Sequence, residues 1–80
     1  MNDHFIINDS VLDDLNSQIT IYYSYPIDTK PRYLSFSLDS FYSFLQENSL
    51  EYSRASDEAK KQIERDFIIS EGGVSETIQG

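Results

Sequence analysis

The stretch QITIYYSYP, residues 18–26, decides the fold together with RYLSFSL, residues 32–38. Both stretches are rich in β-branched and aromatic residues, which favour β-strands. Along each stretch, mainly apolar side chains alternate with side chains that carry hydroxyl groups, as expected in a strand with one buried face. Between them runs a short loop bounded by Pro26 and Pro31, and proline is typical of turns. The sequence therefore predicts an antiparallel β-hairpin over residues 18–38.

The two faces of this hairpin differ in chemistry. One face is apolar and consists of Ile19, Ile21, Tyr23, Tyr25, Leu34, Phe36 and Leu38. The other is rich in hydroxyl groups and consists of Thr20, Tyr22, Ser24, Tyr33, Ser35 and Ser37. We expect helices to cover the apolar face. Tyr22 and Tyr33 then either lie open for binding or pack under another segment, and the pattern leaves both possibilities open.

Two helices are expected after the hairpin. Asp39 or Ser40 can cap the first helix and Ser56 the second, because their side-chain oxygens accept hydrogen bonds from backbone N–H groups. The apolar residues at helical spacing are Phe41, Phe44 and Leu45 in the first helix and Ala55, Ala59, Ile63 and Phe67 in the second. Lys60 and Glu64 have the spacing of an ion pair on the outer surface of the second helix.

The N-terminal segment is expected to contain a short strand followed by a short helix. The apolar run FII at residues 5–7 is typical of a strand. Ser10 and Asp13 then approximate a helix capping box. The residues with the spacing of one or two helical turns are Val11, Leu12 and Leu15. At the other end of the chain, residues 67–70 are assigned to the second helix, with a last strand beside residues 5–7 as the alternative.

Together these elements predict an α+β domain of two layers. A small antiparallel sheet, made of the hairpin 18–38 and a short N-terminal strand, is packed on one face by two C-terminal helices. A helical pair with an attached hairpin is the alternative. The 80 residues suffice for one domain over residues 1–71, followed by a flexible C-terminal tail at residues 72–80. Because a core this small stabilises weakly and no cysteine can form a disulfide, a homodimer is a further expectation.

Acidic residues dominate the charge of the chain. It contains 14 Asp and Glu against 6 Lys and Arg, and its net charge is −8. Residues 1–28 contain no Lys or Arg but include Asp9, Asp13, Asp14 and Asp28. Direct contact with nucleic acid or with an anionic membrane is disfavoured, because both need clustered cations. A basic protein surface would be attracted instead, although an ordinary solubilising surface also accounts for this charge.

No motif indicates catalysis, a metal or a cofactor. His4 is the only histidine and there is no cysteine, so a transition-metal site lacks its usual ligands. The three glycines, Gly72, Gly73 and Gly80, form no phosphate-binding loop. No sequence signature pairs a serine with the histidine. We expect no enzyme activity and no cofactor, and a cytoplasmic location because the first residues do not resemble a signal peptide.

These observations point to a non-enzymatic, protein-binding inhibitor or modulator that acts on a basic surface, such as that of a nucleic-acid-binding protein. The candidate contact residues are Asp9, Asp13, Asp14, Asp28, Tyr22, Tyr33 and Tyr42. In size and charge, though not in any motif, the chain resembles small phage-encoded inhibitors of restriction and CRISPR systems, which implies imitation of nucleic acid by carboxylates. The alternative is a small structural or regulatory subunit, such as an immunity protein, that assembles through a sheet edge or an apolar helix face.

Overall fold

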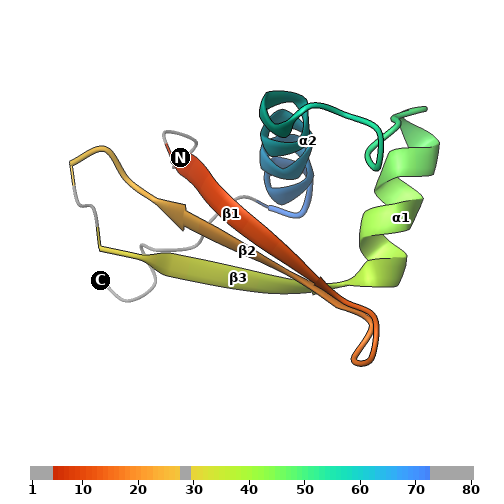
Figure 1. Cartoon of the computed structure of the whole chain (residues 1–80), viewed down its shortest axis with the longest axis horizontal. Helices are drawn as coiled ribbons and strands as arrows, with labels where there is room; N and C mark the ends of the chain where they lie inside the picture. Colours follow the sequence, from red (N-terminus) through yellow and green to blue (C-terminus); the bar gives the residue numbers. More distant parts are fainter. Residues whose placement is uncertain (1–4, 28–29, 73–80) are drawn as a thin grey trace.

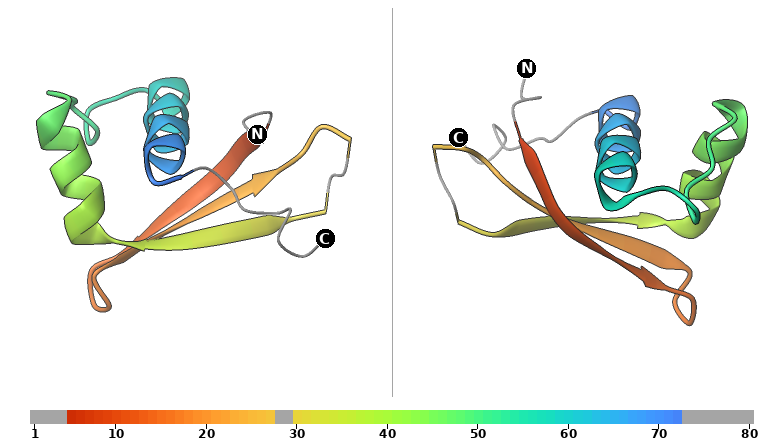
Figure 2. Two further views of the ribbon diagram at one scale, coloured as in Figure 1. Left: turned by 180° about the vertical axis from the view of Figure 1, so that it is seen from behind. Right: turned by 45° about the horizontal axis from the view of Figure 1, so that its top comes forward.

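The computed structural model describes residues 5–27 and 30–72. Its elements are β1 (Ile6–Asp13), β2 (Gln18–Ser24), β3 (Arg32–Ser37), α1 (Leu38–Glu47) and α2 (Asp57–Ser70). The strands form one antiparallel sheet in the order β1-β2-β3. Both helices lie on the same face of this sheet, and no described element covers the other face (Figure 1, Figure 2). The predicted α+β fold, with two helices on one face of a small antiparallel sheet, is confirmed.

The predicted hairpin is formed by β2 and β3. Ile21 pairs with Leu34, and both side chains turn toward the helices. Tyr22 pairs with Tyr33, and both turn away from them. The alternation in the sequence therefore assigned the two faces correctly. Leu38, expected as the last strand residue, instead begins α1 and is buried there.

β1 is longer than expected and extends to Asp13, so the short helix expected around residues 11–15 is wrong. Val11 pairs with Thr20 of β2, and the ladder continues to the end of the strand. A helix of one or two turns is marginal in water, whereas pairing with β2 gives this segment the backbone hydrogen bonds of a sheet along the side that faces β2. Leu15 lies in the turn between the two strands and is 96% exposed.

A β-bulge at Asn8 changes the phase of β1. Ile7 and Asp9 pair with neighbouring residues of β2, so Asn8 is one residue too many for regular pairing. Phe5 and Ile7, before the bulge, are buried under the helices. After the bulge, Ser10 faces the helices and Asp9 faces away from them. The bulge therefore decides which side chains of β1 reach each face of the sheet.

The core lies between the sheet and the two helices. Its fully buried side chains are Ile19, Ile21, Tyr23, Phe41, Phe67 and Ile68. The ring of Phe67 lies 4.9 Å from that of Phe36 and 5.1 Å from that of Phe41, measured between centroids. Edge-to-face contacts of this kind add about 0.5–1.5 kcal/mol per pair to the gain from burial. Neither described helix combines the length and the apolar character needed to cross a membrane.

The start of α1 differs from the sequence prediction. Ser37, not Asp39 or Ser40, is the N-cap, and its Oγ accepts a hydrogen bond from the backbone N–H of Ser40 at 3.1 Å. Because Ser37 is also the last residue of β3, the strand leads into the helix without a connecting loop. This early start buries Leu38, whose N–H donates to the carbonyl of Ser17 at 2.9 Å.

The start and the end of α2 agree with the prediction. Ser56 is its N-cap, and its Oγ accepts a hydrogen bond from the N–H of Ala59 at 3.2 Å. Residues 67–70 belong to this helix, so the alternative of a last strand is wrong. Gly72 follows with a φ of 109°, a conformation that favours glycine after a helix. Of the tail expected at residues 72–80, all but Gly72 lies outside the described residues.

Candidate functional site

The side of the sheet that no described element covers is called the open face here. Its residues are Ile6, Asp9, Val11, Asp13, Gln18, Thr20, Tyr22, Ser24, Tyr33, Ser35 and Ser37. Apolar surface is present on it, since Ile6 and Val11 are each 50% exposed. No Lys or Arg is among these residues, whereas two of them are aspartates. The open face thus has mixed apolar and hydroxyl character and a negative charge.

Tyr22 and Tyr33 lie side by side on the open face. Their ring centroids are 6.0 Å apart and the ring planes are tilted by 44°. Tyr22 is 38% exposed and Tyr33 is 65% exposed. Asp9 of β1 pairs with Tyr22 from the opposite side, so one row across the sheet contains a carboxylate and two phenol rings. Within the described residues, the tyrosines are therefore open rather than packed under another segment.

The carboxylates of the open face have different surroundings. Asp9 Oδ1 accepts a hydrogen bond from the Ser10 N–H at 2.8 Å, which orients the carboxylate. Asp13 is engaged by Asn16, whose side-chain amide donates to Oδ2 at 2.8 Å and whose backbone N–H donates to Oδ1 at 3.2 Å. These bonds from Asn16, above all the one from its side chain, hold the pKa of Asp13 below its usual value. Asp13 thus stabilises the β1–β2 turn, and Asp9 is the acid beside the tyrosines.

The structure gathers four of the seven candidate contact residues on the open face: Asp9, Asp13, Tyr22 and Tyr33. Asp14 lies in the turn next to it. Tyr42 is on α1, in the layer on the other side of the sheet, where it is 46% exposed. A partner lying flat on the open face would not reach Tyr42. Asp28 lies outside the described residues.

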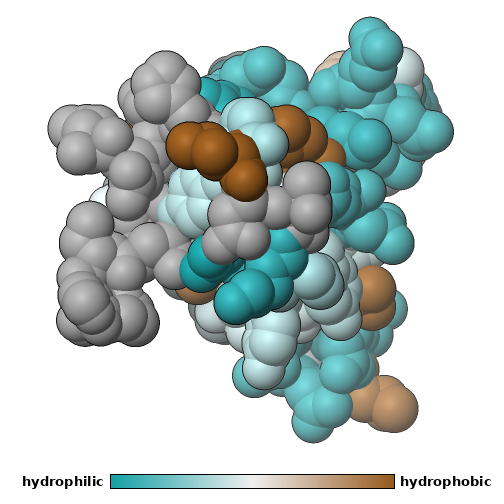
Figure 3. All heavy atoms as spheres, turned by 90° about the vertical axis from the view of Figure 1, so that its left-hand side faces the viewer, coloured by the Kyte–Doolittle hydropathy of each residue, from teal (hydrophilic) through white to brown (hydrophobic). Residues whose placement is uncertain are grey.

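Exposed apolar side chains also occur outside the open face, where the half-exposed Leu12 and Tyr42 line one pocket with Leu45 and Leu50. Leu15 is 96% exposed in the β1–β2 turn, and Ile27 is 95% exposed in the loop between β2 and β3. Figure 3 shows the end of the molecule away from α1, where the apolar residues form small separate areas on a mainly hydrophilic surface. On this side of the molecule, the described residues form no large continuous apolar patch that would indicate another docking surface.

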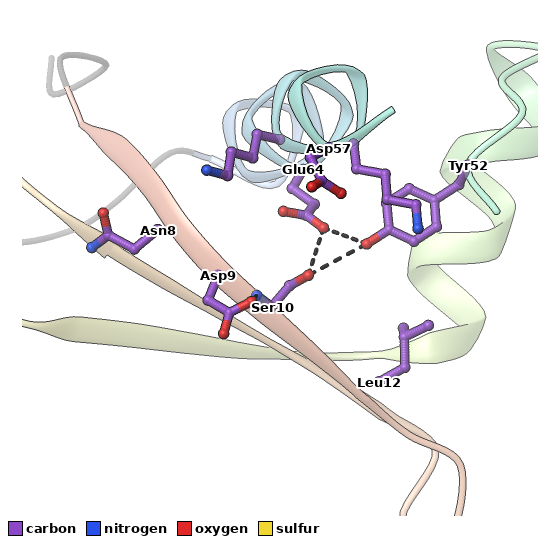
Figure 4. Close-up of a pocket in the computed structure, with 9 residues that line it drawn as sticks. Asn8, Asp9, Ser10, Leu12, Tyr52, Asp57 and Glu64 are labelled. Atoms are coloured by element: carbon purple, nitrogen blue, oxygen red, sulfur yellow. Dashed lines mark hydrogen bonds between the residues drawn. The ribbon is translucent and has the colours of Figure 1, made fainter. Parts of the chain in front are cut away.

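A second polar cluster lies under the helices and was missed by the sequence analysis. Glu64, expected in a surface ion pair, is only 2% exposed. Its Oε2 accepts a hydrogen bond from the Ser10 hydroxyl at 2.7 Å and another from the Tyr52 hydroxyl (Figure 4). Burial, followed by the hydrogen bond to Glu64, raises the pKa of Tyr52 to about 12. The sequence did contain an indication that Glu64 is buried, because Glu64 lies at helical spacing within the buried stripe that includes Ile63 and Phe67.

This cluster lies beside an open pocket of about 440 Å³ between β1 and the first turns of α2 (Figure 4). Charges of both signs line it, including Asp9 at the edge of β1 and Asp57, Lys60 and Lys61 of α2. Serine catalysis needs a base and an orienting group that activate the hydroxyl toward a substrate. The hydroxyls of Ser10 and Tyr52 instead share one buried carboxylate oxygen, an arrangement that joins β1, the connection between the helices, and α2. The geometry therefore supports a structural role for this cluster.

Among the described residues, no three His, Asp or Glu side chains gather closely enough to hold a metal ion. Comparisons of the chain with models of known protein families, with curated proteins and with solved structures found no match. The chemistry of the open face is therefore the main guide to function.

Proposed function

We propose that this protein is a non-enzymatic inhibitor or modulator that binds a basic protein surface through the open face of its sheet. The observation that supports this most directly is the row of Asp9, Tyr22 and Tyr33, exposed on a sheet face that no described element covers. Tyrosine offers a large contact area at a low cost in conformational entropy and is enriched at binding hot spots. A face of this kind is suited to a protein partner.

The distribution of charge favours a basic partner. The open face carries Asp9 and Asp13 and no cation. Basic side chains of the chain are engaged on the helical side: the Arg32 guanidinium carbon lies 5.2 Å from the Tyr25 ring centroid, and that of Arg65 lies 4.7 Å from the Phe5 ring centroid. Carboxylates on a face that carries no Lys or Arg steer a positively charged partner toward this face and orient it there.

The basic surface of a nucleic-acid-binding protein has the required chemistry, since such surfaces concentrate Lys and Arg. By covering that surface, this protein would compete with the nucleic acid. Its resemblance in size and charge to small phage-encoded inhibitors implies the same mode of action.

The test begins with a partner captured from the cells that produce this protein, purified and titrated at several salt concentrations. We expect the Tyr22→Ala, Tyr33→Ala double variant to bind at least about tenfold more weakly. Asp9→Asn should slow association and reduce its dependence on salt, because it removes a steering charge. Glu47→Gln, which removes an exposed acid from α1, is the matched control. Unchanged affinity in the double variant, or binding insensitive to salt, would overturn the proposal.

A second candidate function is assembly through the outer edge of β3, as a small structural or regulatory subunit or a homodimer. β3 is an edge strand, and its six residues include neither a proline nor an acid. The opposite edge, β1, is protected by its bulge and by Asp9 and Asp13. Sedimentation of the purified protein tests self-assembly, and a monomer at concentrations of tens of micromolar would refute the homodimer.

A further inference from the structure

We infer that the open face selects an arginine side chain of its partner, which stacks on the Tyr22 and Tyr33 rings and pairs with the Asp9 carboxylate. This rests on the proposed function, because it takes the open face to be the binding surface and names the chemistry that the face recognises. Two features of the row carry it: two accessible aromatic rings and an oriented carboxylate next to them.

The two rings can accept a planar cation. With centroids 6.0 Å apart and planes tilted by 44°, Tyr22 and Tyr33 do not stack face to face, and both remain partly exposed. A guanidinium group is planar and weakly hydrated, and it stacks on tyrosine more readily than an ammonium group does. This chain makes comparable contacts itself, where Arg32 and Arg65 lie over aromatic rings on the helical side.

Asp9 supplies the second half of the recognition. It pairs with Tyr22 across β1 and β2, and directly opposed residues of neighbouring strands have Cβ atoms about 4.5–5.5 Å apart. The Ser10 N–H holds the carboxylate in place, and Figure 4 shows Asp9 pointing away from the buried Glu64 cluster. A guanidinium stacked on the Tyr22 ring can donate sideways to this carboxylate, and the paired donors of arginine match a carboxylate in a way that lysine cannot.

Other occupants fit this row less well. A purely apolar partner would contact the tyrosines and Val11, but it would cover the Asp9 carboxylate without pairing its charge. The open face of a second copy of this chain contains no Lys or Arg and so offers no cation to pair with Asp9. An arginine satisfies the rings and the carboxylate together.

The probes are hexaarginine and hexalysine, which have equal length and equal formal charge. Each is titrated into the full chain at fixed ionic strength, while nuclear magnetic resonance follows the ring signals of Tyr22 and Tyr33. We expect hexaarginine to bind about fivefold more tightly than hexalysine and to shift both ring signals. The preference should persist in Tyr33→Phe, which keeps a ring, and should fall in Tyr33→Leu, which does not. Asp9→Asn should weaken hexaarginine binding, whereas Glu47→Gln should leave the preference unchanged.

The outcomes separate this inference from the proposed function. Equal binding of both peptides with shifts on the open face would overturn arginine selection and leave a basic-partner surface in place. A preference for hexaarginine that survives Tyr33→Leu and Asp9→Asn together would also overturn it. Shifts confined to other surfaces with both peptides would overturn the proposed function as well. Thermal unfolding of each variant confirms that it is folded.

Discussion

Two neighbouring residues of β1 serve opposite faces of the same sheet. Ser10 points toward the helices and donates to Glu64, which also accepts from Tyr52. Asp9 points to the open face, beside Tyr22. Each face thus combines a carboxylate with tyrosine. Under the helices the charged group is buried and its hydrogen bonds are made within the chain, so the cluster stabilises the fold. On the open face, the same chemistry remains available to a partner.

Glu64→Ala should have the largest effect. The hydroxyls of Ser10 and Tyr52 would lose their shared acceptor beneath α2, at a cost of about 1–3 kcal/mol in the free energy of unfolding measured in urea. Glu64→Gln keeps one acceptor oxygen and should lose less. Glu47→Ala, on the exposed side of α1, should change the stability by no more than about 0.5 kcal/mol. Equal effects of Glu64→Ala and Glu47→Ala would argue against a structural role for the buried cluster.

Alkaline pH should weaken the fold through Tyr52. Its pKa is raised from 10.0 to about 12 in the folded protein, so the unfolded chain releases this proton first as the pH rises. The contribution of Tyr52 is complete below pH 10.0 and is lost progressively toward a pH of about 12. Urea unfolding over this range should show a steeper loss of stability in the original chain than in Tyr52→Phe. Parallel curves for the two proteins would contradict the prediction.

Tyr33→Ala should change stability least. Tyr33 is 65% exposed, and a cross-strand aromatic pair contributes about 0.2–1 kcal/mol. Thermal unfolding should therefore stay close to that of the original chain while partner binding weakens. A loss as large as that in Glu64→Ala would mean that the open face stabilises the fold, and the contrast between the two faces would fail.

The candidate site was predicted in part. Tyr22 and Tyr33 were placed on one face because strand alternation is a local pattern. Asp9 was selected for its charge only, and its place beside Tyr22 depends on the bulge. Glu64 was assigned to the surface because its spacing from Lys60 suggests an ion pair, whereas the depth of a helical residue depends on how the helix packs. Val11 and Leu12 were assigned to a helix because their spacing fits one, and pairing with β2 decided otherwise.

The sequence by itself determined the hairpin of β2 and β3, the opposite character of its two faces and the N-cap of α2. These features depend on the two-residue period of a strand and on hydrogen bonds within one helical turn, so neighbouring residues are enough to specify them. Only the tertiary structure decided the length of β1, the bulge at Asn8 and the burial of Glu64. Each of these depends on groups far apart in the chain, whose free energies are gained only once the strands pair and the helices pack.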